Sequence, residues 1–293
     1  MEELHQPVML KEVLEVLNPK PGESYIDLTA GYAGHASKIL DVTRNYKEAV
    51  LIDRDEFACE ILKEKYAQRE SIKIVNSDFY SAALQEIQCG NSFDLLLADF
   101  GVSSPQLDEE KRGFSFAKTG PLDMRMDQKQ KLTAADIVNK WSERELTEIF
   151  IKYGEEKPGQ ARIIAREIVH NRPYNTTTEL ATVIAAKGRR NRMTHPATRI
   201  FQAIRIVVND ELDEIERTLP LIPRLLRPGG RAAFITFHSL EDRLVKNYLT
   251  EATSYGVESE LEIINKKPLV AGKGELVINP RARSAKLRAC KRI

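Results

Sequence analysis

The chain has 293 residues, of which 42% are hydrophobic and 30% are charged, and its formal net charge is +1. This length suffices for one or two domains with a substantial core. No apolar run reaches the roughly 18 residues that a membrane span needs, and the N-terminus lacks a signal-peptide pattern, so we expect a cytoplasmic protein. The three cysteines lie far apart without a CxxC or Cys/His pattern, which indicates neither a disulfide framework nor a metal site.

A helix is expected over 11–17, because apolar residues recur at helical spacing until Asn18-Pro19 ends it. An apolar strand then begins at Tyr25 and leads through a turn with Gly31 and Gly34 into a second helix. Glycines adopt backbone angles that other residues avoid and let a ligand approach the main chain. The helix after the turn points unpaired N–H groups at the same place. Strand, glycine turn and helix in this order predict a site for a nucleotide-like ligand.

Three further apolar strands follow, and each ends on or beside an aspartate: Asp53, Asp78 and Asp99. The carboxyl ends of parallel strands share one edge of a sheet, where open α/β folds bind their ligands. We therefore expect a row of carboxylates at that edge. Asp53 lies about twenty residues after the glycine turn, the distance at which an acidic side chain reaches the ribose hydroxyls of a bound nucleoside.

The pattern changes after residue 106, and we find no convincing strand from there to residue 210. A loop over 112–127 precedes five helical patterns, at 133–138, 142–150, 161–169, 178–186 and 198–212. A stretch this long is not a loop, so we predict an inserted all-helical domain at 107–210, for substrate recognition, within a domain made of 1–106 and 211–293.

The sheet is expected to resume after the turn at Pro228-Gly229-Gly230, with a buried strand that delivers His238 to the ligand edge. Strands at 260–265 and 274–278 would complete an α/β sheet of seven strands.

Positive charge is concentrated in two places. The first cluster contains Arg189, Arg190 and Arg192, with Arg199 downstream, and the second is an acid-free tail with Arg281, Arg283, Lys286 and Arg288. Local basic patches on a balanced protein suit a polyanion that is contacted at particular places. We expect both clusters to contact the phosphates of a nucleic acid.

The residues around the glycine turn favour one cofactor over another. A nicotinamide dinucleotide site would carry a G-x-G-x-x-G turn, whereas this turn reads Gly31-Tyr32-Ala33-Gly34 and follows Asp27 by four positions. A carboxylate there would repel a pyrophosphate, but it can receive the ammonium of an amino acid directly or through water. This favours S-adenosylmethionine, and the Leu-Arg-Pro-Gly-Gly-Arg run from Leu226 to Arg231 is common in methyltransferases that use it.

Nearly the whole chain resembles the bacterial small-subunit ribosomal RNA methyltransferase H family. The motifs that carry the resemblance are His5 to Val8, Asp27 to His35, Asp99 to Gln106, Arg112 to Phe116, Leu122 to Asp127, Pro196 to Arg199, Phe201 to Ile206, Phe237 to Arg243, Asn279 to Arg281 and Arg283 to Arg288. The resemblance implies a class I methyltransferase (Rossmann-like) sheet with an inserted helical domain. It also implies methylation of the exocyclic N4 of a cytosine in the decoding centre of 16S ribosomal RNA.

The resemblance further implies which residues contact the cofactor: Ala33, Gly34, His35, Asp53, Phe79, Asp99 and Gln106. The family usually has Gly at the position of Ala33 and Ser at that of Ala36. Alanine would be strained at a position that needs a positive φ, so cofactor affinity is a separate question from cofactor identity.

A cytosine amine is a poor nucleophile, because its lone pair is delocalised into the ring. A hydrogen-bond acceptor on the N–H localises that pair, and in-line placement supplies much of the remaining rate. The candidate acceptor is Asp99 or the adjacent turn from Gly101 to Ser104; alternatively, Asp99 only fixes the cofactor. His238 is the second catalytic candidate, with a structural role as its alternative. No metal or covalent protein nucleophile is needed.

The loop from Arg112 to Met126 is a candidate clamp for an extruded base, with core packing of its aromatic rings as the alternative. The substrate contacts that we expect in and before this loop are Ser103, Ser104, Arg112, Phe114 and Arg125.

Three competing functions remain: a methyltransferase of proteins or small molecules, a nicotinamide dehydrogenase, and a non-catalytic factor that grips pre-ribosomal RNA. The basic clusters disfavour the first, and the glycine turn and Asp27 disfavour the second. The sequence leaves open whether the substrate is naked ribosomal RNA or the assembled small subunit, and whether the protein is a homodimer.

Overall fold

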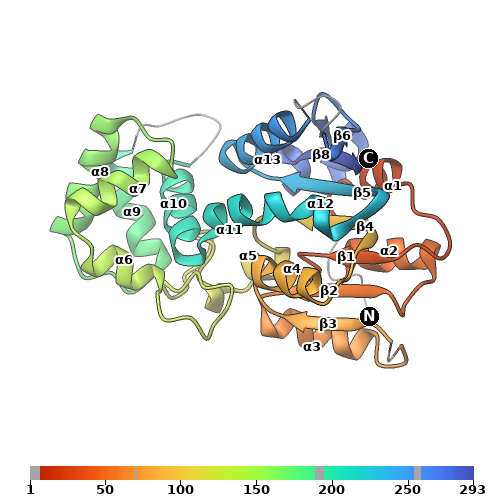
Figure 1. Ribbon diagram of the computed structural model, residues 1–293. Coiled ribbons are helices and arrows are strands. Elements are labelled where there is room, and N and C mark those ends of the chain that lie inside the picture. The colour runs from red at the N-terminus through yellow and green to blue at the C-terminus, as the bar shows by residue number, and fades with distance from the viewer. Residues whose placement is uncertain (1–6, 70, 189–194, 254–258) are drawn as a thin grey trace. The chain divides into compact units, whose positions relative to one another are not determined.

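The structure is a computed structural model that describes residues 7–69, 71–188, 195–253 and 259–293 (Figure 1). The chain divides into a first unit, residues 1–101 and 212–293, and a second unit, residues 102–211. The boundaries expected from the sequence were 106/107 and 210/211. Within the described ranges, no helix has the length and hydrophobicity to cross a membrane.

The first unit is built on an eight-stranded sheet with the order β3-β2-β1-β4-β5-β8-β6, and β7 pairs with β8. Its strands are β1 (Tyr25–Asp27), β2 (Ala49–Asp53), β3 (Lys73–Asn76), β4 (Phe93–Asp99), β5 (Leu226–Thr236), β6 (Leu261–Ile263), β7 (Leu269–Val270) and β8 (Lys286–Arg292). The first five run parallel, and β8 runs antiparallel to its neighbours. The expected α/β fold with a mostly parallel sheet is confirmed.

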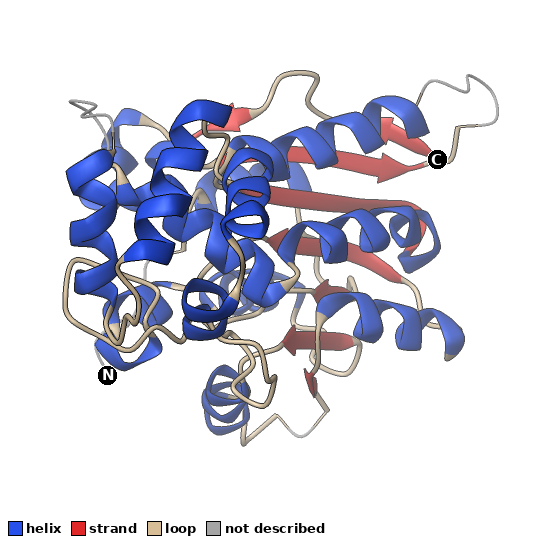
Figure 2. Cartoon of the chain, turned by 90° about the vertical axis from the view of Figure 1, so that its left-hand side faces the viewer, coloured by secondary structure: helices blue, strands red, loops and turns tan. Residues whose placement is uncertain are grey.

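Helices cover both faces of this sheet, which explains why its central strands are largely apolar (Figure 2). Successive residues of β4 belong to different cores: Leu95 and Leu97 to one, Leu96 and Ala98 to the other. The first core includes residues of α1 (Leu10–Leu17), α2 (Gly34–Thr43) and α3 (Glu56–Lys65). The second includes residues of α4 (Phe79–Gln88), α11 (Glu211–Thr218), α12 (Ile222–Leu225) and α13 (Ser239–Ala252).

The C-terminal segment differs from the sequence-based prediction. The strand expected at 260–265 is confirmed as β6, but the one expected at 274–278 is wrong, because Lys273–Ile278 form helix α14. The part of the expected basic tail from Lys286 onward is β8, which lies between β5 and β6, whereas Arg281 and Arg283 lie on a 3-10 helix. Its apolar residues Leu287 and Ala289 are buried, and the basic residues that alternate with apolar ones in this segment do not indicate a strand by themselves. The sheet therefore has eight strands instead of seven.

In its described residues, the second unit is helical apart from one isolated bridge between Pro121 and Thr176. Its helices are α5 (Ser104–Asp108), α6 (Ala134–Lys140), α7 (Glu143–Lys152), α8 (Pro158–His170), α9 (Thr177–Lys187) and α10 (Ala197–Asn209), with a 3-10 turn at Glu110–Arg112. The capping box predicted from Ser142 and Glu145 begins α7. A single apolar core joins α6 to α10, so the predicted helices are confirmed.

The glycine turn connects β1 to α2, and its backbone is unusual at a residue other than glycine. Ala33, the N-cap of α2, has φ 62° and ψ 32° and is fully buried. An L-residue in this left-handed region costs about 1–2 kcal/mol relative to the right-handed helix. The strain expected for alanine at this position is therefore present.

Ala33 and Ala36 offer a matched test of this strain, because both bury one methyl group in the same core. Ala36→Gly is expected to destabilise the protein by about 1.5 kcal/mol, from the lost methyl burial and the added backbone freedom of glycine in a helix. Ala33→Gly loses the same methyl group but relieves the strain, so its free energy of unfolding should stay within about 0.5 kcal/mol of the parent. Urea unfolding measures both, and equal losses in the two variants would contradict this account.

Candidate active site

Three parallel strands end side by side at the glycine turn, and each ends in an aspartate. The central strand β1 pairs with β2 on one side and β4 on the other, with Asp27 opposite Leu51 and Leu97. This register brings Asp27, Asp53 and Asp99 to one edge of the sheet, beside the start of α2.

Asp53 holds the glycine turn. Its carboxylate accepts hydrogen bonds from the backbone N–H of Gly31 at 2.8 Å and from that of Asp55 at 2.8 Å. Desolvation by burial raises the pKa of Asp53 to about 6, although both hydrogen bonds oppose the shift. The carboxylate therefore fixes the turn and places negative charge next to it.

Asp27 was expected to receive a ligand ammonium, directly or through water, and this contact stays a prediction. The side chain is only 1% exposed, and it accepts hydrogen bonds from the Tyr25 hydroxyl at 2.6 Å and the Thr29 backbone N–H at 3.1 Å. Burial raises the pKa of Asp27 to about 7. Asp27 thus shapes the end of β1 from within the protein. Tyr25, two residues earlier and so on the same face of the strand, was the available sequence signal.

Asp99 ends β4 with an oxygen that lacks a protein partner. Its backbone N–H donates to the Thr29 hydroxyl at 2.6 Å. Its Oδ1 is buried and has no hydrogen-bond partner among the described residues, while the side chain as a whole is 21% exposed. Burial, together with the nearby Asp27 and Glu241 carboxylates, raises the pKa of Asp99 well above its usual range. An acceptor of this kind suits a ligand that carries an N–H group or a positive charge.

His35 lies in the first turn of α2 and is 7% exposed. Its Nε2 is 2.9 Å from the backbone carbonyl of Val8, and its Nδ1 is 3.8 Å from Oδ2 of Asp99. Its neighbour Gly34 packs closely, since a Cβ at this position would come within 3.2 Å of the Pro7 ring. The structure therefore turns His35 toward Val8 and Asp99, whereas the sequence resemblance implied a direct contact with the cofactor.

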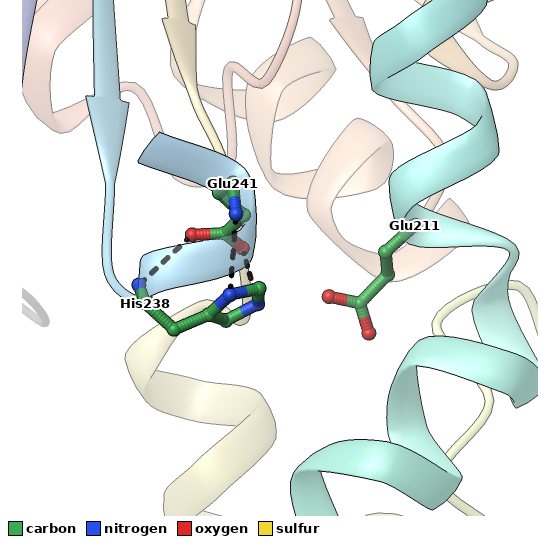
Figure 3. A group of neighbouring side chains, drawn as sticks. All are labelled: Glu211, His238 and Glu241. Carbon is green, nitrogen blue, oxygen red and sulfur yellow. Dashed lines mark hydrogen bonds and ion pairs between the residues drawn. The ribbon is translucent and has the colours of Figure 1, made fainter. Parts of the chain in front are cut away.

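His238 begins α13 as its N-cap (Figure 3). Its Nδ1 accepts a hydrogen bond from the Glu241 backbone N–H at 3.4 Å, and its Nε2 is 3.0 Å from Oε1 of Glu241. Glu241, which is fully buried, accepts in return from the backbone N–H groups of Phe237 and His238. Both ring nitrogens thus face Glu241, which favours the structural role over the catalytic one. Glu211, also drawn, belongs to the second unit and there pairs with Arg205.

Phe79, an expected cofactor contact, is the first residue of α4 and packs against Phe100 with ring centroids 5.7 Å apart. Its backbone N–H donates to Oε1 of Glu214 at 2.8 Å. Glu214 is 2% exposed and lies 3.1 Å from the Arg54 guanidinium, and burial raises its pKa to about 7. Sequence reasoning missed Glu214, because an acidic residue in an amphipathic helix gives no sign of being buried.

The expected ligand contacts at the start of the second unit take part in a helix cap. Ser103 is the N-cap of α5 and exchanges hydrogen bonds with Gln106, and both Gln106 and Ser104 are buried. Contacts of these residues with cofactor or substrate stay predictions.

The loop after α5 is held together by the residues that were expected to clamp a base. Arg112 is 6% exposed, and its Nη2 donates to the carbonyls of Arg125 and Met126. Arg125 is engaged by a two-point ion pair with Asp123, with both distances 2.8 Å. Phe114 lies in the core of the second unit. The alternative of core packing therefore holds for Phe114, and the expected substrate contacts of Arg112 and Phe114 are corrected to internal ones.

The basic residues fall into three groups. Arg189, Arg190 and Arg192 lie outside the described residues. Arg199, Arg281 and Arg283 are exposed. Arg288 is 8% exposed and pairs with Asp242, as does Lys286. The expected phosphate contact of Arg288 is therefore corrected, because Asp242 neutralises this side chain inside the first unit.

Comparisons with known proteins bear on this arrangement. The model of the MraW methylase family matches residues 2–293. A protein of Nostoc sp. named "Ribosomal RNA small subunit methyltransferase H" is 48% identical over 289 residues, which cover 97% of this chain and 91% of the relative. A protein of the same name from Acidobacterium capsulatum is 46% identical, with 99% of each chain covered. Another from Synechocystis sp. is 45% identical, with 99% of this chain and 93% of the relative covered.

The family match and the mostly parallel sheet confirm the class I methyltransferase fold expected from the sequence. The residues present also suit the methyl donor. The N-terminus of α2 favours an anionic group, whereas the buried carboxylates Asp53 and Asp99 favour cationic or hydroxyl groups. The chain belongs to the MraW methylase family, and its cofactor is S-adenosylmethionine.

Proposed function

We propose that this protein methylates the exocyclic N4 of a cytosine in the decoding centre of 16S ribosomal RNA. The shared name of the relatives supports small-subunit ribosomal RNA as the substrate. The sequence resemblance supports the cytosine amine and its location. The observation that carries the chemistry is Asp99 beside the glycine turn, a carboxylate with a raised pKa and with one buried oxygen that has no hydrogen-bond partner among the described residues.

Residues of the first unit would hold the cofactor. The backbone at Gly34 and the N-terminus of α2 suit its carboxylate, Asp53 suits the ribose hydroxyls, and Phe79 suits the adenine. Asp53 retains acceptor capacity, because each of its two oxygens takes one hydrogen bond from the protein. When bound, S-adenosylmethionine supplies an electrophilic methyl group on a sulfonium.

Asp99 would act on the amine. An acceptor with a raised pKa is a stronger base than an ordinary carboxylate, and it pulls electron density from the N–H bond into the nitrogen lone pair. Burial of Asp99 makes this interaction stronger than it would be in water. No protein nucleophile is required, because the methyl group moves directly from donor to amine.

The RNA would be contacted through phosphates. Arg281 and Arg283 are exposed on the 3-10 helix Pro280–Ser284 of the first unit, and Arg199 is exposed on α10 of the second. We assign substrate recognition to the second unit together with this 3-10 helix, and we place the reaction in the cytoplasm.

Small subunits from cells that lack this gene, incubated with the protein and tritiated S-adenosylmethionine, test the proposed function. We expect N4-methylcytidine at one site of 16S ribosomal RNA, identified by nucleoside mass spectrometry. Asp99→Asn keeps the shape of the side chain but removes its charge and basicity, so turnover at saturating cofactor should fall by about 10²–10⁴-fold, which exceeds the loss of cofactor affinity measured by calorimetry.

Two results would contradict these expectations in different ways. Cofactor binding by the parent protein without any incorporation into small subunits would favour a non-catalytic RNA-binding factor. A loss of turnover in Asp99→Asn that is fully matched by a loss of cofactor affinity would reduce Asp99 to a cofactor contact.

The raised pKa values predict a pH dependence. The pKa of Asp27 is about 7 and that of Asp53 about 6, both above the value of 3.8 of an unperturbed aspartate. Between about pH 4 and 7 the folded protein therefore binds protons that the unfolded chain does not, so the stability of the free protein should fall as the pH rises.

The deprotonated carboxylates favour the cationic cofactor, so the rise in Tm on adding S-adenosylmethionine should grow over the same window. Thermal unfolding with and without cofactor from pH 5 to 8 checks both trends. Stability that increases with pH would show that these carboxylates are not destabilised by burial.

The exposed arginines predict a salt dependence. Arg283→Ala should weaken binding to small-subunit RNA irrespective of its sequence and reduce the slope of log K against log salt by about 0.7–0.9. Lys38→Ala, an exposed lysine outside both basic clusters, is the control and should leave the slope unchanged. Titrations at several salt concentrations measure the slope, and an unaltered slope in Arg283→Ala would remove this residue from the interface.

A further inference from the structure

His35 and Asp99 form an acid–base pair at the ligand edge of the sheet. They come from different elements, α2 and β4, and Nδ1 of the histidine lies 3.8 Å from Oδ2 of the aspartate. A displacement of about 1 Å would bring the two atoms to hydrogen-bond distance, and contacts of this kind often tighten when ligands bind.

The tautomer of His35 follows from its other contact. Nε2 lies 2.9 Å from the Val8 carbonyl oxygen, which can only accept a hydrogen bond, so Nε2 carries a hydrogen in every protonation state of the ring. Any change in the charge of His35 therefore occurs at Nδ1, the nitrogen that faces Asp99.

The surroundings of Asp99 favour a cationic partner. The groups that act on it electrostatically are Asp27 from β1 and Glu241 from α13, and both are acidic. Tyr25 is a further titratable neighbour, and its hydroxyl is committed to Asp27. His35 is a neighbour that can take up a positive charge next to Asp99.

We propose that His35 is a positioning residue for methyl transfer, which accepts through Asp99 the proton that the target amine loses. This inference rests on the proposed function of Asp99 and deepens it. It adds to the contact implied by the sequence resemblance, because here the His35 side chain acts on the aspartate.

The proton and electron balance is complete without a further reactant. The amine nitrogen forms a bond to the methyl carbon as the carbon–sulfur bond breaks and leaves its electron pair on sulfur. One proton of the amine passes to the Asp99 carboxylate, and a proton passes from Asp99 to Nδ1 of His35. The imidazolium keeps its Nε2 hydrogen bond to Val8 and returns the proton to solvent after the products leave.

His35→Gln tests this route, because the glutamine amide can still donate to the Val8 carbonyl but cannot take up a proton. We expect kcat to fall by about tenfold or more, with the KM values for S-adenosylmethionine and for small subunits unchanged. Asp99 would keep its own proton to higher pH, so the acid limb of the pH–rate profile should move upward and alkaline buffer should restore kcat. His170→Gln, at an exposed histidine of α8, is the control. An unchanged profile, a loss of equal size at every pH, or a loss carried by the KM for the cofactor would overturn the proposal.

A second measurement needs no activity and no substrate. The chain has five histidines, so nitrogen-15 NMR can follow each ring through a pH titration. We expect His35 to show the Nε2–H tautomer when neutral, and Asp99→Asn to lower its pKa by about one unit, because the opposite charge is lost. The His170 pKa should not move. An unmoved His35 pKa would overturn the coupling, even if His35→Gln failed to fold. Absence of methyl transfer by the parent protein would instead overturn the proposed function, and the NMR result would still decide the coupling.

Discussion

Two hydrogen bonds fix the turn around which the first unit is arranged. The Asp53 carboxylate of β2 accepts from the Gly31 backbone, and the Thr29 hydroxyl accepts from the Asp99 backbone of β4. The turn between β1 and α2 is thus tied to both neighbouring strands. The register of the parallel strands depends on the apolar residues packed on both faces of the sheet. The two cores therefore set the position of the turn and hold the ends of the strands, where the ligand binds, in place.

This arrangement concentrates destabilised negative charge. Asp27, Asp53 and Asp99 all have raised pKa values because they have lost water, and Asp27 and Asp99 also repel one another. Burial without compensation costs stability. A bound cofactor with a sulfonium and an ammonium offsets that cost, so the same carboxylates that weaken the free protein favour the loaded one. His35 offers a smaller and reversible positive charge beside Asp99.

Several charged residues turned out to act inside their own unit. Arg112 and Arg125 hold the loop after α5, and Arg288 and Lys286 pair with Asp242. Each looked like a candidate for a substrate contact, because a sequence shows a charge but not the carboxylate or carbonyl that meets it. His238 also acts inside its own unit. The sequence predicted its position at the end of a buried strand, but not that its ring accepts a hydrogen bond from the Glu241 backbone in the first turn of α13.

The sequence by itself determined the α/β class, the strands that end in aspartate, the glycine turn and the helices of the insertion. These features follow from local periodicity, from the conformational freedom of glycine, and from motifs that are contiguous in the chain. Only the tertiary structure decided that Asp27 is buried and bonded to Tyr25, that β8 is a strand and that His35 faces Asp99. Each of these depends on which groups distant in sequence meet in space, because burial and electrostatic coupling are properties of the packed chain.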